Sequence, residues 1–384
     1  MTQPTVSLYL KNNMHIAYIA NIRFPTEKAH GAAIAKACEA LVRAGEEVTL
    51  LVPARKTHIN VPALQYYGIK YSFIIRRLTC IDVVSFGKLG FWLQSLTFAS
   101  SVLAHLKSSP HDIVYGRDEL VLTVLALCGV KNIYWESHDG TWNIASRYVA
   151  RKAQGIVVVS QGLKDFYTDK GVPAENIVAI PNAIDVPAFA HAETREAARS
   201  RLGLPQDKTI ALYIGRLDGW KGTDTLLEAS KLLPNILVVL IGGEPQHVEK
   251  LKTRYPKAVF LGYRPYTELS DNQAAADVLV VPNTAKNDVS VRFTSPLKLI
   301  AHMASHRPIV ASDLPSIREL VDDTSAVLVE ADNPEALAAG IGKALTSPYI
   351  AEKAYFRATE LDWSARAHHI TTFIQNRRSV TKER

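Results

Sequence analysis

The chain has 384 residues, of which 47% are hydrophobic and 21% charged, and its net charge is +7. The length suits two domains of ordinary size, and the composition excludes a disordered chain, a collagen-like repeat and a coiled coil. The charge is concentrated in the first half, because residues 1–185 carry 19 basic and 14 acidic side chains and residues 186–360 carry 20 and 21. A basic first half favours an anionic partner such as a phospholipid surface; nucleic acid is less favoured because no nucleic-acid-binding motif accompanies the charge.

The three cysteines lie far apart and form no CxxC pair. Their spacing excludes a disulfide scaffold and a zinc site, and it predicts a reducing compartment. The opening MTQPTVSLYLKNN has no basic segment followed by an apolar core, so no secretion signal is predicted. We therefore expect a cytoplasmic protein.

Short apolar runs alternate with helical stretches along the first half. The expected strands are His15–Ala20, Val48–Val52, Asp112–Tyr115, Asn132–Glu136 and Gly155–Ser160, with a helix over Gly31–Ala44. Short apolar runs that end in glycine, serine or a charge are typical of a parallel sheet buried on both faces.

One longer uncharged stretch, Leu89–Leu106, lies between Lys88 and Lys107. Its large apolar residues fall near helical spacing and polar residues interrupt it, which predicts an amphipathic helix rather than a membrane span. Packing against the core is the favoured interpretation, and a position on a membrane surface is the alternative.

The pattern restarts after Pro205. The expected strands are Thr209–Ile214, Ile236–Gly242, Val259–Leu261, Asp277–Pro282, Pro308–Ala311 and Ala326–Val329. This predicts an α/β protein with two doubly wound, Rossmann-like domains facing a central cleft: an N-terminal domain over residues 1–186 and a C-terminal domain over 187–363. A last basic helix within 364–384 is expected to pack back on the first domain or on the second.

Two cations follow the expected strand that ends at Gly215. Arg216 and Lys221 precede a helix expected to begin near Thr223, and such a pair at a helix start suits a diphosphate. A solvated loop with incidental charges is an equally weighted alternative. A second anion site is possible at Gly31, and the absence of GxGxxG counts against an NAD enzyme.

The stretch Ser290–His306 begins as a loop and becomes a helix. Thr294 or Ser295 is expected to cap it, with Pro296 in its first turn and Lys298 one turn further on. An ordinary capped helix without a ligand is the favoured interpretation of this stretch taken alone.

Titratable residues follow two strands of the first half. Glu136, His138 and Asp139 end one strand, and Arg117 follows another, so all four are expected to open onto the cleft. A surface loop without a role is the alternative. No DxD pair, HExxH motif or Cys/His cluster occurs, so neither a tightly bound metal nor a cofactor is expected.

Together these stretches resemble a bacterial or archaeal family 4 glycosyltransferase with the GT-B fold, over nearly the whole chain. The most specific stretches are GRLDGWKG (Gly215–Gly222), LIGG (Leu240–Gly243), FLGYRPYTEL (Phe260–Leu269), ADVLVVPN (Ala276–Asn283) and the segment Thr294–Leu320, which contains TSPLKL and MASHRPIVASDLPSIREL. VVSQGLKDF and IPNAID add to them.

The resemblance implies that a nucleotide sugar binds mainly to the second half and transfers its sugar with retention, without a tightly bound metal. The implied donor-binding residues are Gly31, Arg216, Lys221, Gly242, Tyr263, Arg264, Ser295, Pro296, Leu297 and Lys298. The implied catalytic residues are His138, Arg216 and Lys221, and the implied acceptor-side residues are Arg117, Glu136 and Asp139. Cations and helix dipoles would stabilise the leaving diphosphate.

The sequence departs from the family pattern at two positions. Ala301 stands where a glutamate usually grips the ribose, and Phe293 stands at the position of a second glutamate. The loss of one ribose contact predicts donor binding weaker by about 1–3 kcal/mol, and a glutamate at residue 301 is expected to restore it.

The resulting expectation is a glycosyltransferase that acts on a cell-surface polysaccharide, glycolipid or lipid-linked acceptor, peripherally at the inner face of the membrane. A weakened or inactive nucleotide-sugar-binding scaffold protein is the alternative. An epimerase on the same scaffold and an NAD oxidoreductase are less favoured.

Overall fold

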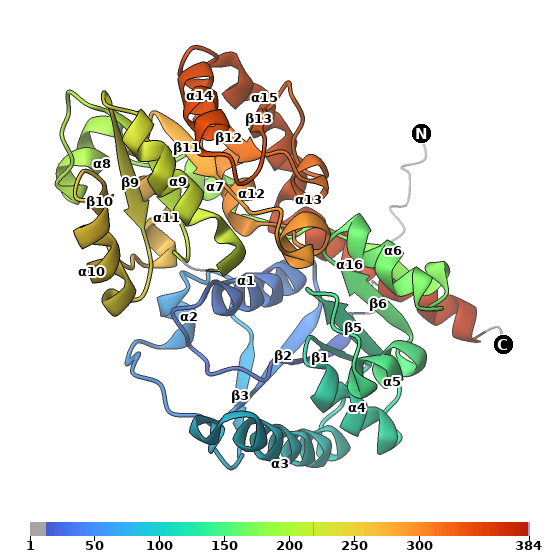
Figure 1. The fold of residues 1–384 in the computed structure, drawn as a ribbon. Coiled ribbons are helices and arrows are strands. Elements are labelled where there is room, and N and C mark those ends of the chain that lie inside the picture. Colours follow the sequence, from blue (N-terminus) through green and yellow to red (C-terminus); the bar gives the residue numbers. More distant parts are fainter. Residues whose placement is uncertain (1–12, 218, 383–384) are drawn as a thin grey trace, which may run out of the picture.

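The computed structural model describes residues 13–217 and 219–382, and two parallel sheets organise them (Figure 1). Asp218 and the end of the stretch 364–384 lie outside that range. The predicted absence of a secretion signal also rests on residues outside it. The prediction of an α/β chain with two doubly wound sheets is confirmed.

The first sheet has seven parallel strands in the order β3-β2-β1-β4-β5-β6-β7. The strands are β1 His15–Ile19, β2 Glu47–Pro53, β3 Ile74–Leu78, β4 Ile113–Gly116, β5 Ile133–Ser137, β6 Gly155–Val158 and β7 Ile177–Ala179. Two of these strands, β3 and β7, were not predicted from the sequence. β3 reads IIRRL, lies at the sheet edge and is largely exposed, and β7 has only three residues, so neither shows a buried apolar run.

The second sheet has six parallel strands in the order β10-β9-β8-β11-β12-β13. The strands are β8 Thr209–Ile214, β9 Ile236–Ile241, β10 Val259–Phe260, β11 Val278–Val281, β12 Ile309–Ser312 and β13 Val327–Val329. The chain leaves the first sheet after Ala179 and enters the second at Thr209; a domain division at residue 186 stays a prediction.

Helices cover the faces of both sheets (Figure 1). They are α1 Ala29–Arg43, α2 Ala63–Tyr66, α3 Gly87–Ser108, α4 Glu119–Leu127, α5 Ile144–Lys152, α6 Gln161–Asp169, α7 Val186–Phe189, α8 Arg195–Leu202, α9 Thr223–Ala229, α10 Pro245–Arg254, α11 Leu269–Ala274, α12 Leu297–Met303, α13 Pro315–Arg318, α14 Pro334–Leu345, α15 Tyr349–Ala358 and α16 Trp363–Lys382.

Helix α3 has the predicted position but packs differently from the favoured interpretation. Val102 and Leu106 are buried as expected, whereas Leu89 is 83% exposed and Trp92 is 53% exposed. The face turned inward instead carries Gln94, which has no exposed surface. Core packing is therefore the wrong interpretation for the first half of this helix.

The last helix returns to the first sheet. α16 packs along α1, and its residues Trp363, Ala367, Ile370 and Ile374 belong to the same buried cluster as β1, β2 and α1. The Tyr134 hydroxyl, on β5, donates to the Ile374 carbonyl at 3.3 Å. The chain therefore crosses between its two halves twice, once before α8 and once at its end.

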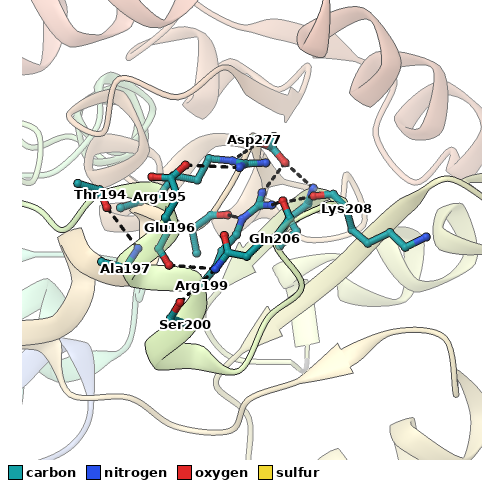
Figure 2. Close-up of polar contacts among 12 residues, drawn as sticks. Thr194, Arg195, Glu196, Ala197, Arg199, Ser200, Gln206, Lys208 and Asp277 are labelled. Carbon is teal, nitrogen blue, oxygen red and sulfur yellow. Dashed lines mark hydrogen bonds and ion pairs between the residues drawn. The ribbon is translucent and has the colours of Figure 1, made fainter.

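Helix α8 is fixed to the second sheet by one buried arginine (Figure 2). Arg199 has no exposed surface, and its Nη2 lies 2.6 Å from Oδ2 of Asp277, immediately before β11. The same guanidinium donates to the carbonyls of Ala275 at 2.9 Å and Lys208 at 2.8 Å. Because its charge is paired and its N–H groups are bonded, burial of this arginine is compatible with a stable fold.

Candidate functional site

A buried carboxylate at the end of β5 organises the first half of the site. Glu136 is 1% exposed, and its Oε1 lies 2.6 Å from Nε2 of His138 and 2.9 Å from an Nη2 atom of both Arg117 and Arg366. The Tyr115 hydroxyl donates to its other oxygen, Oε2. Strand β5 thus presents His138 at the carboxyl edge of the sheet, with its ring held from behind.

The two arginines set the ionisation of this cluster. Burial would raise the pKa of Glu136, but Arg117, Arg366 and His138 hold it well below its usual range. Burial and Arg117 lower the pKa of His138, against the opposite effect of Glu136. Glu136 is therefore a carboxylate and His138 a neutral imidazole near pH 7, which can accept or donate a hydrogen bond at a ligand.

The remaining first-half predictions are distributed around this cluster. His30, next to Gly31 in the first turn of α1, has its pKa lowered to about 4 by burial, Arg117 and other neighbours that include His138. A Cβ atom at Gly31 would lie 2.3 Å from the Tyr67 hydroxyl, so packing inside the first half already requires glycine there. Asp139 is exposed and accepts from the Thr141 amide at 3.0 Å.

Two lysines gather at the end of β8 in the second half. Lys298 Nζ lies 3.2 Å from the Tyr213 hydroxyl, and burial and the nearby Lys221 hold the pKa of Lys298 well below its usual range. Lys221 lies over the Trp220 ring, with its Nζ 3.3 Å from the ring centroid. The nearby charge of Lys221 disfavours the charged form of Lys298, and a bound anion would favour that form.

Arg216 follows the same strand and is exposed, and its carbonyl accepts a hydrogen bond from the Tyr213 hydroxyl. Tyr213 therefore links the loop after β8, through the Arg216 carbonyl, to Lys298 on α12. The three predicted cations, Arg216, Lys221 and Lys298, belong to one end of one sheet.

Glycines allow the strand ends of the second sheet to come close together. A Cβ atom at Gly242 would lie 2.1 Å from the Gly215 carbonyl oxygen, and one at Gly222 would lie 1.6 Å from the Pro282 carbonyl oxygen. Their φ angles are 117° and 68°, which also favour glycine. Packing at the sheet edge therefore already requires glycine at residue 242, and the contact of Gly242 with a donor stays a prediction.

The start of α12 differs from the prediction. Neither Thr294 nor Ser295 caps it: the helix begins at Leu297 after Pro296 and has no side-chain cap among the described residues. Ser295 instead bonds to Asn182 in the first half. Its Oγ accepts from the Asn182 backbone amide at 3.0 Å, and its carbonyl accepts from Asn182 Nδ2 at 2.7 Å. Leu297 packs against the core of the first half.

The Ala301 position is also different from the expectation. Ala301 has no exposed surface and belongs to a buried cluster with Ile184 and Met303. A glutamate there would enter the protein core, where an ionised carboxylate is costly without a partner. The expectation that a glutamate at residue 301 would tighten donor binding is therefore not supported by this packing.

Contacts between the halves connect the two sides of the site. Phe293 lies in the short π-helix Val289–Phe293, yet it is buried in the core of the first half, and its ring centroid lies 5.2 Å from that of Phe166. A Cβ atom at Gly140 would lie 2.5 Å from the Phe293 ring. The loop that carries His138 and the segment that leads to Lys298 are thereby held together.

A second contact joins the predicted nucleobase side to the first half. Tyr263 is 49% exposed, and its hydroxyl lies 3.0 Å from that of Tyr66, at the end of α2. Arg264, beside it, is half-buried. These two residues therefore lie at the boundary between the halves, and their contact with a base stays a prediction.

Sequence reasoning missed Arg366, Tyr115, Asn182 and Glu319. Arg366 contacts Glu136 across 230 residues of chain, and no local motif marks it. Glu319 accepts from the amides of Gln161 at 2.8 Å and Gly162 at 3.2 Å, which joins the second half to the start of α6. A basic C-terminal helix was the only sequence signal that pointed toward any of these contacts.

In the described residues, no group of three or more His, Cys, Asp or Glu side chains is placed to hold a metal ion. Within the same residues, no helix combines the length and apolar character needed to cross a bilayer.

Solved structures share this arrangement of two sheets. Sucrose-phosphate synthase from Thermosynechococcus elongatus aligns over 96% of this chain and all of its own with a TM-score of 0.77, at 20% identity. Anabaena HepE, solved with UDP and glucose, aligns over 94% of this chain and all of its own with a TM-score of 0.75, at 18% identity. The fold is that of the GT-B glycosyltransferases.

Residues 32–187 match the family model described as Glycosyltransferase Family 4, and residues 208–347 match the one described as Glycosyl transferases group 1. Because the two matches together span most of both halves, the chain belongs to the family 4 (group 1) glycosyltransferases, as the resemblance predicted.

Two curated relatives illustrate the match. The chain is 28% identical over 222 residues to a D-inositol 3-phosphate glycosyltransferase from Streptomyces bingchenggensis, and the alignment covers 53% of this chain and 46% of that protein. It is 27% identical over 212 residues to the putative teichuronic acid biosynthesis glycosyltransferase TuaC from Bacillus subtilis, and this alignment covers 55% of this chain and 51% of that protein. The chain thus spans about half the length of these curated relatives.

Proposed function

We propose that this protein transfers a sugar from a nucleotide-sugar donor to an acceptor of cell-surface polysaccharide or glycolipid assembly, with retention at the anomeric carbon. The observation that carries the proposal is the pairing of two groups of residues. Lys298 donates to the Tyr213 hydroxyl at the carboxyl end of β8, where burial and the nearby charge of Lys221 lower the pKa of Lys298, and His138 is held by Glu136 at the edge of the first sheet.

Several features support a donor with a diphosphate. A bound diphosphate would neutralise the charge that Lys221 and Lys298 place together, and Arg216 could bind it bidentately. As the bond to the sugar breaks, negative charge grows on the leaving diphosphate, and fixed cations stabilise that charge more than they stabilise the intact donor. Among structures of similar fold, HepE was solved with UDP and glucose.

The first-half residues suit a role near the transferred sugar and the acceptor. A neutral His138 can hydrogen-bond a sugar hydroxyl without repelling the lysines, and Arg117 and Asp139 would contact the acceptor. The acceptor class is inferred from relatives named for inositol 3-phosphate and teichuronic acid. We further propose that transfer needs no tightly bound metal, because cationic side chains take the place of one at the diphosphate.

Thermal unfolding in the presence of UDP-, GDP- and ADP-sugars tests the donor. A ligand that binds only the folded state raises the melting temperature by mass action, so one nucleotide series should stabilise the protein and the others should not. The proposal fails if no nucleotide sugar binds.

The phosphate contacts are tested by Lys221→Ala, Lys298→Ala and Arg216→Ala. Each should weaken binding of the nucleoside diphosphate by about 1.5–3 kcal/mol and leave binding of the bare nucleoside nearly unchanged. Lys250→Ala, which removes an exposed lysine on α10, is the control. Equal loss in the control variant, or unchanged diphosphate binding in all three variants, would place the cation site elsewhere.

Retention and metal independence need separate measurements. NMR of the product formed early in the reaction should show the donor's anomeric configuration. Turnover should survive EDTA. An inverted product would overturn retention alone, and loss of turnover with EDTA that Mg²⁺ or Mn²⁺ restores would overturn metal independence alone.

A further inference from the structure

The outer face of α3 and the turn before it form the apolar patch, defined as Ile81, Phe86, Leu89, Phe91, Trp92, Leu93 and Leu96. Leu89 is 83% exposed, Phe86 78% and Trp92 53%. The described chain exposes sixteen large hydrophobic residues in all, and these seven fall within sixteen consecutive positions. Figure 1 shows α3 on the outer side of the first half, away from the second half. Such clustering is unusual for a surface that faces only water.

Polar contacts fix the patch in its outward position. Gln94 and Ser95 have no exposed surface on the inner face of α3. Gln94 Nε2 donates to Asn21 Oδ1 at 2.9 Å, and Asn21 Nδ2 donates to Ser95 Oγ at 2.9 Å. A rotation of the helix that buried Leu89 and Trp92 would break these bonds and expose Val102 instead. The sequence therefore specifies an exposed apolar face.

The charged residues close to the patch in the sequence are almost all basic. Residues 83–106 contain one charged side chain, Lys88, and residues 71–107 contain four basic side chains and one acidic. That acid, Asp82, lies 2.9 Å from Arg55 and is already paired. The basic side chains are Arg76, Arg77, Lys88 and Lys107. An apolar, aromatic-containing stripe in a segment whose charges are basic is typical of a helix that lies in the interface of an anionic bilayer.

The hydroxyl groups of α3 also suit an apolar surrounding. Thr97 Oγ1 donates to the Leu93 carbonyl at 2.9 Å, and Ser100 Oγ donates to the Leu96 carbonyl at 3.0 Å. These donors are satisfied within the helix, so contact with acyl chains would not leave them without a partner.

We propose that the apolar patch docks the protein on the surface of an anionic phospholipid bilayer. Phe86, Leu89 and Trp92 enter the boundary between headgroups and acyl chains, and the basic side chains of β3 and α3 contact phosphates. This inference deepens the proposed function, because it implies an acceptor carried by the membrane. Asn21, which holds α3, also donates to Asp118 Oδ2 at 3.0 Å, and Asp118 directly follows Arg117 of the site in the chain.

The test is co-sedimentation of the full chain with vesicles of phosphatidylcholine, with and without phosphatidylglycerol. Wild type should bind the anionic vesicles, and binding should fall as salt rises because salt screens the charges. The double variant Leu89→Gln/Trp92→Gln should bind about tenfold more weakly, since two apolar anchors are lost. Phe356→Gln, at a residue 70% exposed on α15, is the matched control and should bind like wild type.

Lys88→Glu separates the electrostatic contribution. It should reduce binding to anionic vesicles and flatten the salt dependence, without affecting the melting temperature. Brominated lipid should quench tryptophan fluorescence in wild type and less in Trp92→Gln, which locates the contact. Wild-type binding that the double variant retains in full would overturn the proposal.

Two further outcomes would overturn it in different ways. If wild type ignores vesicles and light scattering shows a dimer that Leu89→Gln/Trp92→Gln dissociates, the patch joins two copies of the chain. If wild type neither binds vesicles nor self-associates, the patch has no such role. Donor stabilisation in the thermal assay is independent of these results, so failure of docking and failure of the proposed function are distinguishable.

Discussion

Glu136 shows how one residue can connect distant parts of the chain. Its carboxylate forms ion pairs with Arg117 on the loop after β4 and with Arg366 on α16, and it orients His138 on the loop after β5. The sequence placed Glu136 and His138 correctly at a strand end, because a short apolar run ending in polar residues marks that edge. It could not reveal Arg366, because the partner is brought in by tertiary packing.

The ionisation of Glu136 predicts a pH dependence of stability. Its folded pKa lies below the unfolded value of about 4.3. The resulting stability is complete above that value and is lost as the pH falls toward the folded pKa. Between pH 5 and about pH 3 the free energy of unfolding should therefore fall more steeply in wild type than in Glu136→Gln, as measured by urea unfolding. Parallel pH curves for the two proteins would contradict this prediction.

Arg199 gives a second prediction at this scale. Arg199→Ala leaves carbonyl oxygens and part of Asp277 without their buried partner, and it should cost about 3–5 kcal/mol of unfolding free energy. Arg195 is the more exposed partner of the same carboxylate: its side chain is 31% exposed, and its Nε lies 2.9 Å from Asp277 Oδ1. Arg195→Ala should therefore cost less than about 1 kcal/mol of unfolding free energy. Chemical denaturation compares the two variants. Equal costs would show that burial of Arg199 adds nothing.

Helices show where sequence patterns reached their limit. In α3 the spacing of apolar residues predicted the helix correctly and its buried face wrongly, because Gln94 and Ser95 are bound by Asn21, 73 or more residues earlier in the chain. A pattern measures periodicity, and it cannot say which face finds a polar partner. The predicted cap of α12 was wrong for the same reason, because the Ser295 hydroxyl accepts a hydrogen bond from Asn182 instead.

The start of α6 carries a prediction at the level of elements. Glu319, from the other half, accepts from the Gln161 and Gly162 amides, which α6 itself leaves without partners. Glu319→Ala should cost about 1 kcal/mol and speed hydrogen exchange in residues 161–163. Glu319→Gln keeps one side-chain carbonyl acceptor and should show a smaller effect. Unchanged exchange in both variants would mean that water replaces this cap without cost.

Phe293, which stands where the family pattern has a second glutamate, makes one of the contacts that join the two halves of the molecule. Phe293→Ala should cost about 3–5 kcal/mol as a large-to-small core change. Because the side chain comes from the second half and packs in the first, the loss should also separate the unfolding of the halves. Calorimetry should show one transition in wild type and a broadened or double one in the variant.

Phe356→Ala, at an exposed residue of the second half, is the control and should leave the transition unchanged. A single, sharp transition in Phe293→Ala, shifted only in temperature, would show that other contacts couple the halves.

The return of α16 to the first sheet has a consequence for synthesis on the ribosome. The buried cluster around β1 and α1 includes Trp363, Ala367, Ile370 and Ile374, and these residues are translated only after the whole second half. The amino-terminal half therefore leaves the exit tunnel with part of its core uncovered, and it stays so while the second half is made. Domain-by-domain folding during translation cannot finish in chain order here. The first half is completed only after the second half has been made, and the nascent chain must keep that apolar surface from aggregation until α16 arrives.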